Sequence, residues 1–438
     1  MKIEELYKIY LKTPFITTDS RDIQKSSLFF ALRGNKFNGN SFAESALQNG
    51  AAFAVIDDKD YLVNDKCILV ENVLKTLQSL ASYRRKKLGV PVIAVTGTNG
   101  KTTTKELLYA VLSKKYKVTV TKGNLNNHIG VPLTLLTMNN ETEFCIIEMG
   151  ANHIGEITQL CLISDPDYGI VTNIGKAHLE GFGSLEGVIK AKSELYYFLK
   201  EKKGHILYNL DNPILSKIVR QVKTESISYG TGKKAFCQGM KLSADPYLKL
   251  QIKNYPSING LKDIDINTNL TGDYNFENVM AAICTGIYMK VNIKLIAEAI
   301  NEYHPLNNRS QLLNTTKNKV IIDCYNANPT SMEAAIFSFS KLDPKGYTKV
   351  LILGDMFELG KYSIIEHKKI INIIKKLAFG KVYLVGQDFQ KTNTNKYFMT
   401  FITPDELIQF FSKNPLTHAY ILLKGSRGIK MEKLLDIL

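Results

Sequence analysis

Short apolar runs alternate with longer amphipathic segments along the chain, and this alternation predicts an α/β protein. Runs rich in β-branched and aromatic residues predict buried strands at 27–32, 52–56, 67–70, 92–95, 117–121, 144–148, 169–172 and 205–209. Segments with amphipathic character predict helices at 41–49, 73–85, 105–112, 185–199, 275–289 and 293–302. The stretch 226–270 alternates polar and apolar residues, which predicts short strands that expose one face to solvent.

The last third of the chain returns to a regular order of strand, loop and helix. Its apolar runs predict strands at 320–323, 350–353, 382–385, 397–402 and 419–423, with helices between them. This order is typical of a doubly wound, Rossmann-like α/β domain. No G-x-G-x-x-G opens this region, so a dinucleotide is not indicated.

Two breaks in the pattern predict domain boundaries. The first break is the basic run Arg84–Lys87 followed by Gly89 and Pro91, which is typical of a linker. The second break is at Pro305, which follows the end of an expected helix. We therefore expect an α/β protein with three domains: a small N-terminal α/β domain, a central P-loop ATPase domain with a parallel sheet, and a C-terminal Rossmann-like doubly wound domain. Their expected ranges are 1–88, 89–305 and 306–438.

Composition agrees with a globular protein that stays inside the cell. The 438 residues are 45% hydrophobic and 22% charged, so disorder is not expected. No apolar run approaches the ~20 residues needed to cross a bilayer, and the first residues lack the apolar stretch of a signal peptide. We expect a cytoplasmic protein. The six cysteines form no C-x-x-C pair, which favours reduced core thiols over zinc or disulfides.

The net charge of +15 has two interpretations. It could serve a nucleic acid or an anionic small substrate. However, lysine is spread along the whole chain and forms no basic block interleaved with aromatic residues, which favours a generally basic, solvated surface.

The most informative stretch runs from Val92 to Lys105 and reads V-I-A-V-T-G-T-N-G-K-T-T-T-K. An apolar strand, a glycine turn and a helix start would surround an anion with backbone N–H groups, so we predict a phosphate-binding nest. Lys101 would reach the terminal phosphates and the Thr102 hydroxyl would ligate Mg²⁺. The spacing G-x-x-G-K-T is shorter than the usual motif, which leaves a purely structural glycine turn as the alternative. The expected nest residues are Gly97, Thr98, Asn99, Gly100, Lys101, Thr102 and Thr103.

Further polar segments follow expected strand ends, where parallel α/β sheets bind ligands. The Asn-rich loop 123–132 predicts either turns alone or amides that bind a sugar or diphosphate. Glu148 ends an apolar strand, so we favour a metal-supporting role over an unpaired buried carboxylate. His178 lies past another strand end and is favoured as a ligand. Lys190 and Lys192 point about 200° apart on their helix, so at most one faces the site.

Several other loops are candidates with a weaker signal. Asp19, Ser20 and Arg21 form a polar turn that could offer carboxylate, hydroxyl and guanidinium groups to a ligand, or could be an ordinary surface turn. In the last domain, segments beginning at Asp323, Gly354 and Lys424 each follow a predicted strand, where this fold class binds ligands.

Taken together, these segments resemble the Mur ligase family, which joins amino acids onto the peptide stem of the cell-wall precursor. The resemblance spans nearly the whole chain and rests on T-D-S-R, G-T-N-G-K-T-T-T-K-E, G-N-L-N-N-H-I-G-V-P, E-M-G-A-N-H, A-H-L-E-G-F-G-S, Y-N-x-x-N, Y-N-A-N-P, G-D-M-F-E-L-G and K-G-S-R. The G-N-L-N-N, Y-N-A-N-P and G-D-M-x-E-L-G segments resemble the member that adds D-alanyl-D-alanine. The D-N-P-R motif of the diaminopimelate-adding member is absent.

The resemblance implies an activity and a set of ligands. It implies ATP-driven addition of D-alanyl-D-alanine to UDP-N-acetylmuramoyl-tripeptide through an acyl phosphate, with two Mg²⁺ ions. The N-terminal domain would grip the UDP end, the central domain would hold ATP, and the C-terminal domain would close over the nucleotide. The implied partners are these small molecules, with no nucleic acid, no integral membrane contact and a monomeric state.

The resemblance also implies residue roles. Lys101 and Thr102 would engage phosphate and the first Mg²⁺, Glu148 and His178 would hold metal, and Lys192 matches a lysine that carries a carbamoyl group in the family. The implied catalytic residues are Lys101, Lys192, His178 and Arg309. On the nucleotide side the implied residues are Asn275, Asn278, Arg309, Asp323 and Tyr325. On the substrate side they are Ser20, Arg21, Asn124, Asn126, Asn127, Asn326 and Asn328.

Two positions depart from the family pattern. Asn38-Gly39-Asn40 stands where the family often has D-G-H, which predicts altered uridine contacts, and Asn308 stands where glycine is usual before Arg309, which predicts a different loop backbone. Three other functions remain open: a folylpolyglutamate synthase, a nucleic-acid-stimulated P-loop ATPase that uses the positive charge, and a noncatalytic muropeptide-binding protein.

Overall fold

The computed structural model describes residues 1–13, 15–256, 264–377 and 379–438. Its internal contacts group these residues into two compact units. Unit 1 comprises Met1–Ala94, Tyr116–Gly150 and Glu156–Tyr168, and unit 2 comprises Val95–Lys115, Ala151–Gly155 and Gly169–Leu438. The three expected domain ranges stay a prediction.

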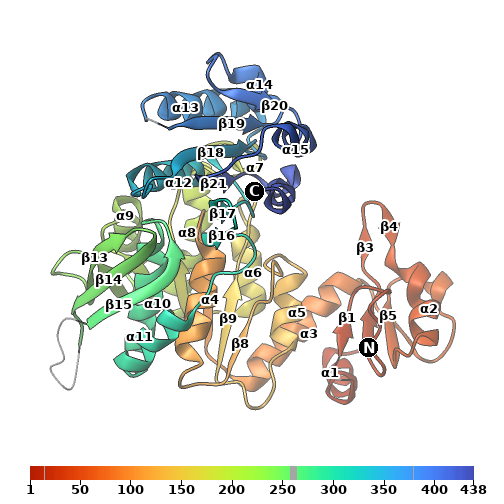
Figure 1. Ribbon diagram of the computed structural model, residues 1–438. Helices are drawn as coiled ribbons and strands as arrows, with labels where there is room; N and C mark the ends of the chain where they lie inside the picture. Colours follow the sequence, from red (N-terminus) through yellow and green to blue (C-terminus); the bar gives the residue numbers. More distant parts are fainter. Residues whose placement is uncertain (14, 257–263, 378) are drawn as a thin grey trace. The chain divides into compact units, whose positions relative to one another are not determined.

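Unit 1 begins with a small parallel sheet of strand order β1-β2-β5-β6. Its strands are β1 (Ile16–Thr17), β2 (Leu28–Phe30), β5 (Phe53–Ile56) and β6 (Cys67–Leu69), and its helices are α1 (Ile3–Lys12), α2 (Ala43–Gln48) and α3 (Val73–Leu88). Phe29, Ala54 and Ile56 form the core between this sheet and α2. A short hairpin of β3 (Arg33–Gly34) and β4 (Phe37–Asn38) interrupts the order of strands and helices (Figure 1).

The rest of unit 1 positions Glu148. Strands β8 (Val118–Val120) and β9 (Phe144–Glu148) pair in parallel. The Cys145 N–H donates to the Pro91 carbonyl oxygen at 3.0 Å, which sets β9 beside the start of β7 (Val92–Thr96). Helices α5 (Gly130–Leu136) and α6 (Glu156–Ser164) complete this part, and neither was expected from the sequence.

Unit 2 contains a large sheet with strand order β15-β14-β13-β12-β11-β10-β7. Its remaining strands are β10 (Tyr168–Val171), β11 (His205–Asn209), β12 (Ser226–Gly230), β13 (Cys237–Ala244), β14 (Tyr247–Asn254) and β15 (Ile264–Thr271). The last three pair antiparallel, and β14 alternates buried and exposed residues, as expected for a sheet with one solvated face. Residues 257–263 of the expected 226–270 stretch lie outside the described residues. The accompanying helices are α4 (Lys101–Leu112), α7 (Leu179–Phe182), α8 (Leu185–Lys202), α9 (Pro213–Val222), α10 (Asn275–Tyr288) and α11 (Ile293–Glu302).

The C-terminal part of unit 2 is a second sheet of strand order β16-β17-β21-β18-β19-β20 (Figure 1). Its strands are β16 (Gln311–Asn314), β17 (Lys319–Asp323), β18 (Thr348–Gly354), β19 (Lys381–Val385), β20 (Met399–Phe401) and β21 (Ala419–Lys424), and its helices are α12 (Pro329–Lys341), α13 (Ser363–Lys375), α14 (Gln387–Thr392) and α15 (Pro404–Lys413). Every pair except β16 with β17 is parallel.

Both faces of this sheet are buried, which explains its continuous apolar runs. In β21, Tyr420 and Leu422 pack with α12 and α13, whereas Ile421 and Leu423 pack with α15 on the opposite face. Side chains of a strand alternate between faces, so a strand covered on both sides needs apolar residues at every position. The expected doubly wound α/β class is therefore confirmed.

The cysteines also lie where the sequence predicted. All six are buried and none is in a disulfide. Burial raises the pKa of Cys145 to about 12, so this thiol stays protonated. Among the described helices, none combines the length and apolar character that crossing a bilayer requires.

Candidate active site

The glycine turn between β7 and α4 has the geometry of a phosphate nest. Gly97 and Gly100 have φ of 140° and 77°, where a side chain is strained. A Cβ at Gly97 would collide with the Thr172 hydroxyl, and one at Gly100 would collide with the Asn278 amide. Helix α4 starts at Lys101, directly after the turn, so its N-terminal N–H groups face an anion at this position.

Neighbouring loops hold the turn in place. The Thr98 hydroxyl accepts from the Gly175 N–H at 2.9 Å, and the Asn99 N–H donates to Asn173 Oδ1 at 3.0 Å. The Lys101 ammonium donates to the carbonyl oxygens of Gly97 and Thr98 at 3.0 Å each. Lys101 is thus folded over the turn, where it can exchange carbonyl partners for phosphate oxygens.

Two asparagines of α10 lie against the same turn. Asn275 Nδ2 donates to the Thr271 carbonyl oxygen at 2.8 Å and to the Ser310 hydroxyl at 3.1 Å. Asn278 Nδ2 donates to Asn275 Oδ1 at 2.9 Å, and Asn278 Oδ1 accepts from the Thr104 hydroxyl at 3.2 Å. Both asparagines are buried, and their amides order the loops around the phosphate turn. Their adenine contact stays a prediction.

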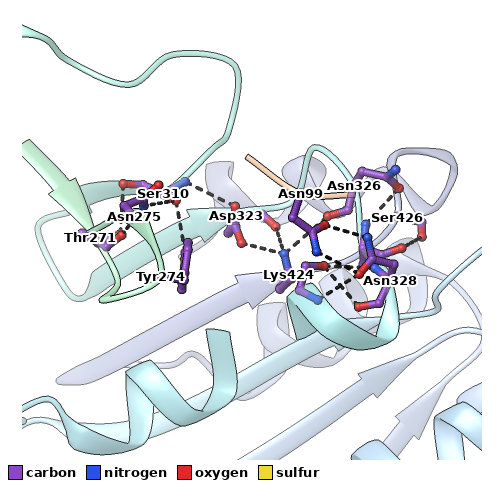
Figure 2. Close-up of polar contacts among 12 residues, drawn as sticks. Asn99, Thr271, Tyr274, Asn275, Ser310, Asp323, Asn326, Asn328, Lys424 and Ser426 are labelled. Carbon is purple, nitrogen blue, oxygen red and sulfur yellow. Dashed lines mark hydrogen bonds and ion pairs between the residues drawn. The ribbon is translucent and has the colours of Figure 1, made fainter. Parts of the chain in front are cut away.

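The ends of β17 and β21 bring an ion pair to this region. Lys424 Nζ donates to Asp323 Oδ2 at 2.6 Å, and the Ser310 N–H donates to Asp323 Oδ1 at 3.3 Å (Figure 2). Tyr274 and Asn275 meet the other side of Ser310, so this serine links α10 to the C-terminal sheet. Each carboxylate oxygen of Asp323 thus has one partner and can still accept a second hydrogen bond, for example from a ribose hydroxyl.

The loop before β16 presents Arg309. Asn307, Asn308 and Ser310 all have positive φ, at 61°, 56° and 50°. Asparagine tolerates this left-handed conformation better than other residues with side chains, so Asn308 adopts the backbone that a glycine would provide. Asparagine in place of glycine at position 308 therefore does not require the different loop backbone that the sequence predicted. The Arg309 guanidinium stacks on Tyr325, with its Cζ 3.6 Å from the ring centroid.

His178 has a carboxylate partner from the C-terminal sheet. Glu358, in the loop after β18, pairs with His178 Nδ1 at 2.5 Å, and the Glu180 N–H donates to the Glu358 carbonyl oxygen at 3.2 Å. The hydrogen bond from His178 lowers the pKa of Glu358. Because Nδ1 is engaged, Nε2 is the nitrogen of His178 left to face a ligand.

Phe182 places His178 and Lys192 on one aromatic ring. The His178 and Phe182 ring centroids are 6.3 Å apart, and Lys192 Nζ lies 5.5 Å from the Phe182 centroid. Lys192 is buried and Lys190 is exposed, as the 200° separation on α8 requires. An ammonium here would repel a bound Mg²⁺, whereas a carbamate on Lys192 would be an anion that could help to hold the ion.

The aspartate of G-D-M-F-E-L-G shapes the loop that carries Glu358. The carboxylate of Asp355 accepts from the N–H groups of Asp388 and Phe389 at 2.9 Å each. His367 Nε2 accepts from the Met356 N–H at 3.1 Å, which assigns its proton to Nδ1. Asp355, Asp388 and His367 have the spacing of a metal cluster, but each has a protein partner at a possible ligand atom, with Asp388 Oδ2 accepting from the Ser363 hydroxyl at 2.6 Å.

The remaining candidates belong to unit 1. Glu148, buried at the end of β9, accepts from Asn126 Nδ2 at 2.8 Å. Asn127 Oδ1 accepts from the Gly130 N–H at 2.9 Å and so caps the start of α5, while Asn124 is exposed. Asn127 therefore supports a turn of the loop 123–132, whereas Asn126 bonds to Glu148 outside it, and ligand binding by these amides stays a prediction.

The N-terminal turn pairs internally. Arg21 forms a bidentate contact with Asp19, and its hydrogen bonds lower the pKa of Asp19 to about 2. Ser20 is half-buried beside it. Asn40 is buried and donates to Asp57 Oδ1 at 2.9 Å, so this departure from D-G-H is an internal support of the β3–β4 hairpin and its surroundings.

The residues that could hold Mg²⁺ have a suitable donor set. Mg²⁺ prefers oxygen ligands, and in unit 2 Thr102 supplies a hydroxyl. Thr102 is buried, and within the described residues its hydroxyl makes no hydrogen bond, so it is available as a ligand. A carbamate on Lys192 would add oxygen donors, and His178 would add Nε2.

Some residues of the site were not predicted from the sequence. Ser310, Tyr274, Lys424 and Glu358 all make contacts that join separate segments (Figure 2 shows the first three). Lys424 and Glu358 lie in motifs that the sequence analysis identified. The motifs indicated functional loops, but they did not indicate which contacts these two residues make. Ser310 follows Arg309 directly, and nothing in its sequence environment indicates its bonds.

A mixed sheet with parallel strands, a phosphate nest and a second sheet with polar strand ends define a P-loop nucleotide-binding protein. Three family models match the chain: the Mur ligase family catalytic domain at 12–98, the Mur ligase middle domain at 95–286, and the Mur ligase glutamate ligase domain at 308–427. The chain belongs to the Mur ligase family.

Relatives and solved structures match nearly the full length. A UDP-N-acetylmuramoyl-tripeptide–D-alanyl-D-alanine ligase of Bacillus subtilis is 36% identical over 96% of this chain and 92% of its own. A crystal structure of MurF from Acinetobacter baumannii has a TM-score of 0.87 at 28% identity, covering 98% of this chain and 97% of its own. MurF ligase from Thermotoga maritima in complex with ADP has a TM-score of 0.85 at 25% identity, covering 98% and 97%. The resemblance read from the motifs is thus confirmed.

Proposed function

We propose that this chain is an ATP-dependent ligase that adds D-alanyl-D-alanine to UDP-N-acetylmuramoyl-tripeptide. The full-length similarity to ligases named for this reaction supports the choice of substrates. The observation that carries the proposal is the meeting of the phosphate loop with the C-terminal strand ends, where Asn328 Nδ2 donates to Asn99 Oδ1 at 2.7 Å. A nucleotide in the nest would therefore be next to loops suited to a second substrate.

The first chemical step is attack of the tripeptide carboxylate on the γ-phosphorus of ATP. The new bond joins the carboxylate oxygen to phosphorus, the bond to the β,γ-bridging oxygen breaks, and ADP leaves. Two anions approach each other, so cations must neutralise the repulsion. Lys101 supplies one charge at the nest, and Arg309, held on Tyr325, supplies a second.

In the second step the dipeptide amine attacks the acyl phosphate. The amide bond forms, the bond from carbonyl carbon to phosphate oxygen breaks, and inorganic phosphate leaves with the amine proton passed to solvent or a base. The chain must exclude water, which would otherwise hydrolyse the acyl phosphate. The loop after β18 contacts His178 and Glu180, so we expect it to help exclude water from the bound nucleotide.

Mg²⁺ is the second part of the proposal. Thr102, Glu148, His178 and a carbamoylated Lys192 would hold two ions, which would neutralise phosphate charge and polarise the γ-phosphate. Asn275, Asn278, Asp323 and Tyr325 would border the nucleotide. Ser20, Arg21, Asn124, Asn126, Asn127, Asn326 and Asn328 would border the other substrates. We expect a monomeric cytoplasmic enzyme.

Release of phosphate from ATP tests this function. We expect release only when UDP-N-acetylmuramoyl-tripeptide and D-alanyl-D-alanine are both present, with equal amounts of ADP and lengthened muropeptide. Release that depends on DNA or RNA would instead support the nucleic-acid-stimulated ATPase, with steep dependence on salt. Release with a folate and glutamate would support the folylpolyglutamate synthase.

A further inference from the structure

Two arginines meet on one aromatic ring at the edge of the C-terminal sheet. Arg309 Cζ lies 3.6 Å and Arg427 Cζ lies 5.3 Å from the ring centroid of Tyr325. Arg427 Nη1 also donates to the Tyr325 hydroxyl at 3.4 Å. Tyr325 follows β17 and Arg427 follows β21, and these strands pair in parallel, so both residues lie at the carboxyl ends of the strands.

Neither guanidinium has an acidic partner in the described part of the chain. The salt bridges found there involve other arginines, such as Arg21, Arg33 and Arg85. Arg309 Nε is buried and makes no hydrogen bond with a described residue. Two like charges share one ring without a counter-ion, and cation–π contacts with a tyrosine compensate only part of that repulsion.

The backbone around both arginines is fixed. The Tyr325 N–H donates to the Asn308 carbonyl oxygen at 3.3 Å, which ties the Arg309 loop to the Tyr325 loop. The Ser426 N–H donates to the Asp355 carbonyl oxygen at 3.1 Å, immediately before Arg427. Arg427 itself is exposed, so a solute can reach its guanidinium. Backbone hydrogen bonds therefore hold the loops of Arg309 and Arg427 in place, while the guanidinium of Arg427 stays accessible to a ligand.

We propose that Arg427, held on the Tyr325 ring, forms a binding site for a carboxylate of an incoming substrate. A guanidinium offers two parallel N–H donors that match the two oxygens of a carboxylate. This inference rests on the proposed function, which supplies the candidates. The triphosphate already has Lys101, Arg309 and the start of α4, whereas the terminal carboxylate of D-alanyl-D-alanine has no assigned cation. A carboxylate of the tripeptide other than the reacting one is the second source of the same chemistry.

The test compares D-alanyl-D-alanine with its C-terminal amide, which lacks the carboxylate. We expect the unaltered protein to favour the acid by about tenfold to a hundredfold in kcat/KM, the range for a hydrogen bond to a charged group. Arg427→Gln should reduce this preference to about threefold or less. Arg427→Lys, which keeps the charge but not the two parallel donors, should fall between them.

Lys430→Gln is the matched control, because it removes a charge three residues along the same exposed loop without contacting Tyr325. It should keep the full preference for the acid. If Arg427→Gln instead keeps that preference but raises the KM for UDP-N-acetylmuramoyl-tripeptide about tenfold, the carboxylate site is supported and its source is the muropeptide. An effect on the KM for ATP alone, or no effect on any substrate, would overturn the proposal.

Binding measurements separate this site from the overall reaction. The dissociation constants of the acid and amide dipeptides can be measured calorimetrically in the presence of ADP, without turnover. If the unaltered protein makes no lengthened muropeptide, the proposed function fails. A preference for the acid that Arg427→Gln removes would still support the carboxylate site, and equal binding of both dipeptides by the unaltered protein would reject the dipeptide as its ligand.

Discussion

Asn99 of the phosphate loop and Asn328 at the start of α12 exchange hydrogen bonds between their side-chain amides. Asn328 Nδ2 donates to Asn99 Oδ1 at 2.7 Å, and Asn99 Nδ2 donates to Asn328 Oδ1 at 3.5 Å (Figure 2). Asn328 Oδ1 also accepts from the Ser331 N–H at 2.9 Å and thereby caps α12. Asn328 thus stabilises the start of α12 and also contacts the nest. Substitutions that keep one of these contacts and remove the other can separate the two roles.

Substitution of Asn328 should affect both stability and nucleotide affinity. Asn328→Ala removes the cap and should lower the free energy of unfolding by about 1 kcal/mol. Asn328→Asp keeps a capping oxygen, so stability should hold, but its charge next to the nest should weaken ATP binding about tenfold. Asn292→Ala, which removes the cap of α11, is the control and should change stability alone. Calorimetric titration with ATP that finds equal affinity in all three variants would contradict this account.

Gly100 should be required for nucleotide binding because a side chain there would collide with Asn278, in addition to straining the backbone. Gly100→Ala and Gly89→Ala both place alanine at positive φ, at 77° and 63°, which costs about 1–2 kcal/mol. A Cβ at Gly100 also meets the Asn278 amide, whereas one at Gly89 meets nothing within 4 Å. Both variants should therefore melt earlier, but only Gly100→Ala should weaken ADP binding, by about tenfold or more. Equal ADP affinity in the two variants would count against the nest.

Glu358 should support metal binding through His178. A carboxylate on one ring nitrogen fixes the tautomer and raises the basicity of the other, and losing such a partner costs about 10–100-fold in metal affinity. Glu358→Ala should weaken Mn²⁺ binding to the ADP complex by this amount, as measured by electron paramagnetic resonance. Glu366→Ala removes a different acidic contact, to Lys176, and should leave Mn²⁺ affinity unchanged. Equal affinities would show that Glu358 only connects loops.

Lys192 should carry the carbamoyl group that the family resemblance implies. Lys192 is buried and shares the Phe182 ring with His178, so a carbamate there would be an anion beside an expected metal ligand, whereas Lys190 is exposed. With ¹³C-labelled bicarbonate, carbon NMR should detect one carbamate signal in the unaltered protein and in Lys190→Ala. The signal should vanish in Lys192→Ala. A signal that survives in Lys192→Ala would place the modification elsewhere.

Much of the fold follows from local pattern. The apolar run of β21 and the alternation of β14 predict their burial because side-chain direction in a strand has a period of two residues. The nest was also predictable, because glycine spacing and a helix start act within a few residues. Helix α1 was missed, since its short amphipathic segment lies before the first clear strand.

Side-chain partners were much harder to predict. The Glu358 contact with His178 joins positions far apart in the chain, so neither residue's neighbours indicate the pair. Asn308 illustrates a second difficulty: its difference from glycine suggested a changed backbone, but φ of 56° is open to asparagine. Asn40 is buried and bonds to Asp57, a partner that its local sequence does not indicate, and the altered uridine contacts stay a prediction.

In the proposed mechanism, ATP activates the tripeptide acid by phosphorylating it. The most direct test uses UDP-N-acetylmuramoyl-tripeptide labelled with ¹⁸O in the reacting carboxylate, together with ATP and D-alanyl-D-alanine. Attack of that carboxylate on the γ-phosphorus and later loss of phosphate must transfer one labelled oxygen to inorganic phosphate. We predict one ¹⁸O in each phosphate released by the unaltered protein, and little turnover in Lys101→Ala. Lengthened muropeptide formed together with unlabelled phosphate would contradict the account.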